Sequence, residues 1–124
     1  MMQPVDRSNG SPGVRTAVRR EGRLTVLSVG GDVDLATATT LSEQIRTVLG
    51  HRPPILVLDL TDVEFLASAG LQVLVDAYRT APSTRVAVVA AGPATRRPIT
   101  MTELHQLLEL YPSLDKARAA LGGD

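Results

Sequence analysis

Two short stretches of this sequence concentrate the side chains that could do chemistry or contact a partner. The first, GGDVDLAT at residues 30–37, places two carboxylates, Asp32 and Asp34, directly after an apolar run. The second, TDVEFLASAG at residues 61–70, places the hydroxyl of Ser68 just before a helical pattern. Each stretch follows a predicted strand and opens a predicted helix, so in a parallel sheet both would lie at the carboxyl ends of the strands. We therefore expect any functional site at that edge.

The hydroxyl of Ser68 has two interpretations. Serine is a preferred N-cap residue, so its role could be structural only. Alternatively, a serine at a helix start is a suitable phosphoacceptor, because free N–H groups and the positive end of the helix dipole stabilise a phosphate. The added charge of about −2 beside several carboxylates would alter any partner surface, so one modification could act as a switch.

An enzymatic interpretation rests on the paired carboxylates of Asp32 and Asp34. Their spacing resembles the nucleophile loop of haloacid-dehalogenase-like phosphatases, in which paired carboxylates hold magnesium and one attacks phosphorus. The chain has a single lysine, Lys116, far from mid-sequence, and no second acidic pair to complete such a site. Neither His51 nor His105 has neighbours at triad or metal-ligand spacing. A polar turn is the better interpretation, and we expect no catalytic residue, metal or cofactor.

Composition narrows the class of protein further. The 124 residues have room for one domain, and 13 basic side chains balance 13 acidic ones without a basic patch for nucleic acid. The absence of cysteine excludes disulfides and thiolate metal sites. No apolar run is long enough to cross a membrane, and the first ten residues lack the apolar core of a signal peptide. We expect a cytoplasmic protein with no membrane or nucleic-acid partner.

The hydrophobic pattern predicts an α/β domain at residues 14–122, after a disordered tail at residues 1–13. Strands are expected at residues 14–19, 23–29, 55–60, 84–91 and 107–111, and helices at 37–49, 68–81 and 113–122. Between the last two strands, Pro98 should limit any helix to a turn or two. Helices that alternate with apolar strands imply a largely parallel or mixed sheet, with the first strand added as a hairpin partner.

Four segments of the chain together resemble a STAS domain of the bacterial anti-sigma factor antagonist type. They are GDVDLATATTL, ILVLDLTDVEFLASAGLQVLV, RVAVVAAGPATRR and LLELYPSLDKARAAL, within about residues 14–122. The resemblance implies the STAS fold, a four- to five-stranded mixed sheet flanked by helices, without catalysis by the domain. It also implies a partner: an anti-sigma factor that is a serine kinase of the histidine-kinase-like ATPase fold, whose capture frees a sigma factor.

The same resemblance implies a phosphorylation site. In the family the kinase modifies a serine within a D-S-[ST]-G motif, and a phosphatase reverses the modification. The matching segment here places Ser68 at the phosphoacceptor, but Ala67 replaces the aspartate and Ala69 replaces the second hydroxyl. The residues expected at the partner surface are Asp32, Asp34, Ala67, Ser68, Ala69, Gly70 and Leu71. A constitutive antagonist remains an alternative, as does a non-phosphorylated STAS sensor or scaffold that binds a nucleotide or other ligand in a signalling complex.

Overall fold

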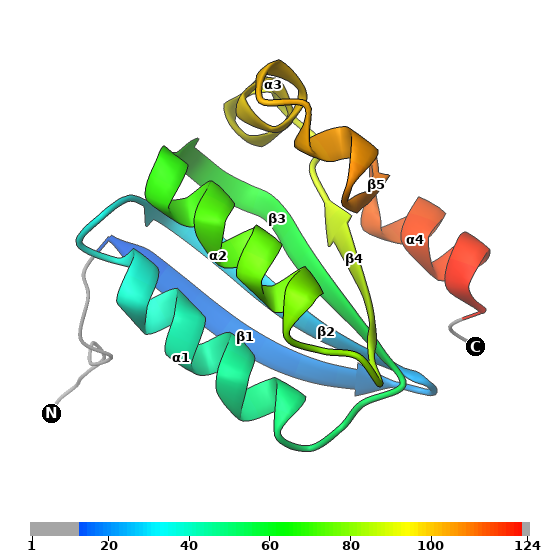
Figure 1. Ribbon diagram of the computed structural model, residues 1–124. Coiled ribbons are helices and arrows are strands. Elements are labelled where there is room, and N and C mark those ends of the chain that lie inside the picture. The colour runs from blue at the N-terminus through cyan, green and yellow to red at the C-terminus, as the bar shows by residue number, and fades with distance from the viewer. Residues whose placement is uncertain (1–12, 123–124) are drawn as a thin grey trace, which may run out of the picture.

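The computed structural model describes residues 13–122 as one mixed five-stranded sheet with helices on both faces (Figure 1). The strand order is β1-β2-β3-β4-β5; β1 and β2 form an antiparallel hairpin, and the other neighbours are parallel. This arrangement confirms the predicted α/β class and the hairpin at the start of the domain. Residues 1–12, which make up most of the predicted tail, lie outside the described residues.

The order of the elements along the chain also follows the prediction. The strands are β1 (Val14–Glu21), β2 (Leu24–Val33), β3 (Ile55–Leu66), β4 (Arg85–Val89) and β5 (Glu109–Tyr111). The helices are α1 (Ala38–Leu49), α2 (Ser68–Arg79), α3 (Pro93–Met101) and α4 (Leu114–Leu121), with a short 3-10 helix, η2 (Leu104–Gln106). None of the helices within residues 13–122 has both the length and the apolar character needed to cross a membrane.

The sheet separates two apolar layers. On one face, α1, α2 and α3 cover residues such as Leu27 and Leu58, and on the other face α4 covers residues such as Val26 and Val57. Successive side chains of a strand point to opposite faces, so a strand covered on both sides needs apolar residues at nearly every position. The nearly continuous apolar run at Ile55–Leu60 of β3, interrupted only by the half-buried Asp59, meets this requirement. It confirms the strand predicted at these residues and places that strand inside the sheet.

Strands β2 and β3 are longer than their sequences indicated. The sequence predicts strands that end at residues 29 and 60, but β2 continues to Val33 and β3 to Leu66. Residues 30–33 of β2 pair in parallel with residues 62–66 of β3. The register shifts twice in this region, once before Gly30 and once after Gly31. Gly31 has φ +90, and a side chain there would overlap the carbonyl oxygen of Gly13. The predicted ends of both strands were therefore wrong. Pairing between β2 and β3 extends each strand through residues of turn-like composition.

Helix α3 is also longer than predicted. It runs for nine residues through Pro98, which was expected to limit it to a turn or two. A proline at this position removes one hydrogen bond, to the carbonyl of Ala94, and Ala94 lies at the surface where water can replace it. Beyond the proline, Ile99 is fully buried in the main core. Packing of Ile99 holds the helix in place despite the missing bond.

The last helix begins and ends as its sequence indicated. The hydroxyl of Ser113 accepts a hydrogen bond from the backbone N–H of Lys116 at 3.1 Å, and Gly122 ends the helix with φ 69. An ion pair ties α4 to the end of β1: Arg118 Nε donates to Glu21 Oε1 at 2.8 Å. This ion pair links α4 to the β1–β2 hairpin.

Candidate functional site

The two segments singled out in the sequence meet at one end of the sheet. The backbone N–H of Ala67, just before α2, donates to the carbonyl of Val33, the last residue of β2, at 2.8 Å. One residue earlier, Asp32 is paired in register with Phe65 of β3. Both segments therefore lie side by side around the first turn of α2. We call residues 32–37 and 65–69 the strand-end surface.

Ser68 occupies the first helical position of α2, and Ala67 is the N-cap. Ala67 has no side-chain oxygen, so no cap hydrogen bond forms there. The Ser68 side chain is exposed, and its hydroxyl has no hydrogen-bond partner within residues 13–122. The interpretation of Ser68 as the helix cap is therefore wrong. Its hydroxyl faces solvent and is accessible to another molecule.

The backbone around Ser68 provides a favourable environment for negative charge. The N–H groups of Gly70 and Leu71 both donate to the carbonyl of Ala67, at 2.9 and 3.1 Å. The N–H groups of Ser68 and Ala69 precede them and have no intrahelical acceptor, as expected for the start of a helix. These groups carry the positive end of the helix dipole, so a phosphate on Ser68 could accept hydrogen bonds from them.

Gly70 and Leu71 fix the position of the first turn of α2 against the ends of β2 and β3. A Cβ atom on Gly70 would lie 2.6 Å from both Leu66 Cδ1 and Val33 Cγ1, so only glycine lets α2 approach the strand ends this closely. Leu71 is buried, with 6% of its surface exposed. Both residues were predicted at the partner surface, and the structure places them beneath it, where they position Ser68.

The two aspartates of the first segment differ in their surroundings. The carboxylate of Asp34 accepts the N–H of Thr37 at 3.1 Å, and the Asp34 N–H donates to the Thr37 hydroxyl at 3.0 Å. The buried Thr37 hydroxyl also donates to the carbonyl of Asp32 at 2.8 Å. Asp34 thus helps to build the start of α1, whereas the side chain of Asp32 is exposed. Our sequence reasoning missed Thr37, although an Asp three residues before a Thr at a helix start is a capping signal.

Two exposed apolar side chains in the strand-end surface were also not predicted as site residues. Leu35 is 83% exposed and Phe65 is 53% exposed. Large apolar side chains in solvent are typical anchors of protein interfaces. The sequence had no signal for these two residues. Phe65 stands beside Leu66 in a short apolar stretch, and which of its positions are exposed depends on the neighbouring strands.

The surroundings of the carboxylates bear on the phosphatase alternative. One oxygen of Asp34 is engaged by backbone N–H and hydroxyl groups at the start of α1. Across the described part of the chain, no three His, Asp or Glu side chains are grouped so that they could hold a metal ion. The geometry at Asp32 and Asp34 therefore offers no paired, free carboxylates for magnesium.

Comparison with known proteins agrees with this architecture. Residues 15–117 match the model of the STAS domain family. The chain is 38% identical over 111 residues to the anti-sigma-F factor antagonist RsfB of Mycobacterium tuberculosis, with coverage of 89% of this chain and 91% of the relative. It superposes on the crystal structure of an anti-sigma factor antagonist from Mycobacterium paratuberculosis with a TM-score of 0.84 and 44% identity, covering 89% of this chain and 96% of that one. An anti-sigma-factor antagonist (STAS) domain protein from Planctomyces limnophilus shares the fold, with a TM-score of 0.72, 16% identity and coverage of 85% and 95%. From its sequence, its fold and these relatives, the chain belongs to the STAS domain family.

Proposed function

We propose that this protein is an anti-sigma factor antagonist that captures an anti-sigma factor at the strand-end surface and thereby frees a sigma factor. The observation that carries the proposal is the exposed hydroxyl of Ser68 at the start of α2, which has no partner among residues 13–122 and lies on a surface that also exposes Leu35 and Phe65. The names of its relatives support the same function. The domain acts by binding, without catalysis, and works in the cytoplasm.

The chemistry of the surface favours a protein partner. Leu35 and Phe65 supply apolar area, and Asp32 supplies one exposed carboxylate beside them. A central apolar cluster with a polar rim is the usual anatomy of a protein interface. We infer that the partner is an anti-sigma factor of the serine-kinase type, with the histidine-kinase-like ATPase fold.

Phosphorylation of Ser68 would then switch the antagonist off. A phosphate adds a charge of about −2 at the centre of the surface, and this charge must be desolvated when the partner docks. The free N–H groups of the first turn of α2 can hold the phosphate without disturbing the fold. Because Ala67 replaces the aspartate of the family motif, the kinase must recognise the segment through other contacts. A phosphatase would restore the active form.

Binding measurements with variants of Ser68 test the proposal. The wild-type protein should capture at least one anti-sigma factor of its own organism in a pull-down experiment, and Ser68→Ala should bind equally well. Ser68→Glu should bind at least about tenfold more weakly, because its carboxylate opposes docking. Ser83→Glu adds the same charge to an exposed turn after the other end of α2 and should bind like wild type. Capture of no anti-sigma factor would contradict the proposed function.

The apolar anchors provide a second test that does not depend on phosphorylation. Phe65→Ser should weaken binding by tenfold or more, as expected for the loss of a buried aromatic anchor. Tyr78→Ser is the matched control, because Tyr78 is 43% exposed near the other end of α2 and should not touch the partner. Equal losses in both variants would mean that the partner binds elsewhere.

Intact-mass spectrometry separates a regulated antagonist from a constitutive one. Incubation with the captured anti-sigma factor and magnesium-ATP should add the mass of one phosphate to the wild type and none to Ser68→Ala. If no phosphate is added and Ser68→Glu binds as well as wild type, the protein is a constitutive antagonist and Ser68 is no switch.

A further inference from the structure

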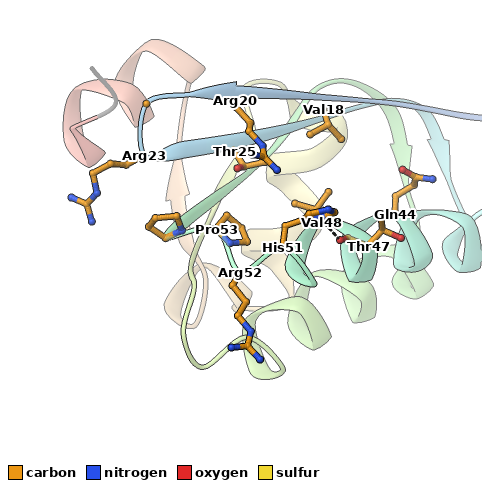
Figure 2. A pocket seen from close by; sticks show the side chains of 12 residues that line it. Val18, Arg20, Arg23, Thr25, Gln44, Thr47, Val48, His51, Arg52 and Pro53 are labelled. Carbon is orange, nitrogen blue, oxygen red and sulfur yellow. Dashed lines mark hydrogen bonds between the residues drawn. The ribbon is translucent and has the colours of Figure 1, made fainter.

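A second concave site lies at the other end of the sheet. A cavity of about 310 Å³ opens between the β1–β2 hairpin and the last turn of α1 (Figure 2). It lies beside Pro53, just before β3 begins, whereas Ser68 follows the end of β3. Twelve strand residues separate these ends, or roughly 35–40 Å. The cavity is thus independent of the strand-end surface.

The buried hydroxyl of Thr25 lines this cavity without a hydrogen-bond partner among the described residues. Thr25 lies in β2, is only 7% exposed, and its hydroxyl makes no hydrogen bond to any residue of the described range 13–122. Alternation along β2 places it on the same face as Leu27, toward α1. Buried hydroxyl groups are nearly always hydrogen-bonded, and an unpaired one is costly. A group that enters the cavity could supply the missing partner.

Beside Thr25 lies the guanidinium of Arg20, which is also unpaired within the described part of the chain. Arg20 of β1 pairs in register with Thr25, and both line the cavity. Figure 2 shows the two side chains pointing from the strands toward Val48 and His51 of the α1 end. Arg20 forms no ion pair within residues 13–122, whereas its neighbour Glu21, on the opposite face of β1, binds Arg118. Arg20 is therefore available to an anion.

The remaining lining adds positive charge and apolar walls. Arg23 and Arg52 lie at the mouth, where Figure 2 shows them projecting away from the centre. None of the described residues that line the cavity carries a carboxylate. Val18, Val48 and Pro53 form apolar walls. Gln44, Thr47 and His51 add further polar groups. A concave site of a few hundred cubic ångströms that combines apolar walls with polar groups able to orient a ligand is typical of small-molecule binding.

We propose that this cavity binds a small organic anion, with an acidic head group and a compact apolar body. The head group accepts hydrogen bonds from the guanidinium of Arg20 and the hydroxyl of Thr25. The planar guanidinium matches the oxygens of a carboxylate and of a phosphate, so both head groups fit. The apolar body packs against Val18, Val48 and Pro53.

Three aromatic probes of the same body test the proposal: benzoate, phenyl phosphate and neutral benzamide. In ¹⁵N–¹H correlation spectra of the full chain, benzoate or phenyl phosphate should give saturable shifts of the Thr25, Val48 and His51 amides. Benzamide should give none at equal concentration. The relative affinities of the two acids identify the preferred head group.

Variants of the two polar groups complete the test. Arg20→Gln should weaken binding of the acid by about tenfold or more, as expected for loss of a charge-assisted hydrogen bond. Thr25→Val keeps the shape, removes the hydroxyl and should also weaken binding. Arg19→Gln is the control, because this neighbouring guanidinium lies on the opposite face of β1 and pairs with Glu21 at 3.0 Å.

Three results would overturn the proposal. The first is the absence of saturable shifts with both acids, and the second is shifts that map outside the cavity. The third is binding to Arg20→Gln or to benzamide as tight as that of wild type to the acids. Spectra of the free variants with dispersed, wild-type-like peaks show that any loss of binding is not a loss of fold.

Discussion

The close approach of α2 to the strand ends makes Gly70→Ala a sharp test of how the site is built. A Cβ atom on Gly70 would lie 2.6 Å from Val33 Cγ1 and from Leu66 Cδ1, well inside van der Waals contact. The methyl end of Leu66 can rotate away, but Val33 is β-branched and fully buried, so its side chain cannot. The first turn of α2 must therefore move outward, and Ser68 must move with it.

The size of the effect follows from two opposing contributions. Extra methyl groups in a packed core cost about 1–3 kcal/mol. Replacing glycine by alanine in a helix gains up to about 1 kcal/mol, and less in the first turn. Because Leu66 can yield, the cost should fall in the lower half of its range. We expect Gly70→Ala to lower the free energy of unfolding by about 1 kcal/mol, or the melting temperature by about 4 °C.

Urea denaturation followed by far-ultraviolet circular dichroism measures this difference, and suits a chain without tryptophan. A double-mutant cycle with Val33→Ala identifies the cause, because this change removes the methyl group that Gly70→Ala would strike. In that background Gly70→Ala should be neutral or stabilising, with a coupling of about 1 kcal/mol. Gly50→Ala is the control, since Gly50 has helical φ −62 and its Cβ would meet only backbone oxygens, the nearest at 3.3 Å. Its stability should change by less than about 0.5 kcal/mol.

The reasoning is refuted if Gly70→Ala is as stable as wild type or more stable. It is also refuted if the loss is the same with Val33 and with Ala at position 33. Either result would mean that α2 does not rest on Val33 as closely as the structure has it. The glycine would then serve only backbone freedom.

Two further predictions concern the ends of the sheet. Arg118, with Arg19, holds the pKa of Glu21 down to about 2, so this carboxylate stabilises the fold above its ordinary pKa of 4.5 and loses that effect as pH falls through about 2. Glu21→Gln should cost about 1 kcal/mol at neutral pH, a value typical of a partly exposed ion pair. In urea denaturation near pH 2 most of this difference from wild type should be gone. Thr37→Val removes a buried hydroxyl that forms hydrogen bonds with the backbone before α1. It should lower the free energy of unfolding by about 1–3 kcal/mol in the same assay. Thr39→Val is the control and should change stability little, because Thr39 lies on the exposed side of α1. Equal effects of the two threonine changes would contradict the role of Thr37.

Much of the fold could be predicted from local patterns because those patterns act over a few residues. The nearly continuous apolar run at Ile55–Leu60 is typical of a strand covered on both faces, and β3 is such a strand. Ser113 and Gly122 bound α4 because a hydroxyl and a left-handed glycine satisfy helix ends within one turn. The meeting of the two polar segments near Ser68 followed from the parallel order of β2 and β3.

The details of the site depended on contacts between distant segments, which no local pattern records. Ser68 is the first helical residue and not the cap, because the N–H of Ala67 is held by Val33, 34 positions earlier in the chain. Strand pairing extended β2 and β3 through residues of turn-like composition, and packing of Ile99 carried α3 past a proline. The sequence by itself determined which elements form and in what order, since propensity and hydrophobic period are local. Only the tertiary structure decided which side chains at their ends are buried, paired or free, because that depends on which neighbours the fold brings within a few ångströms.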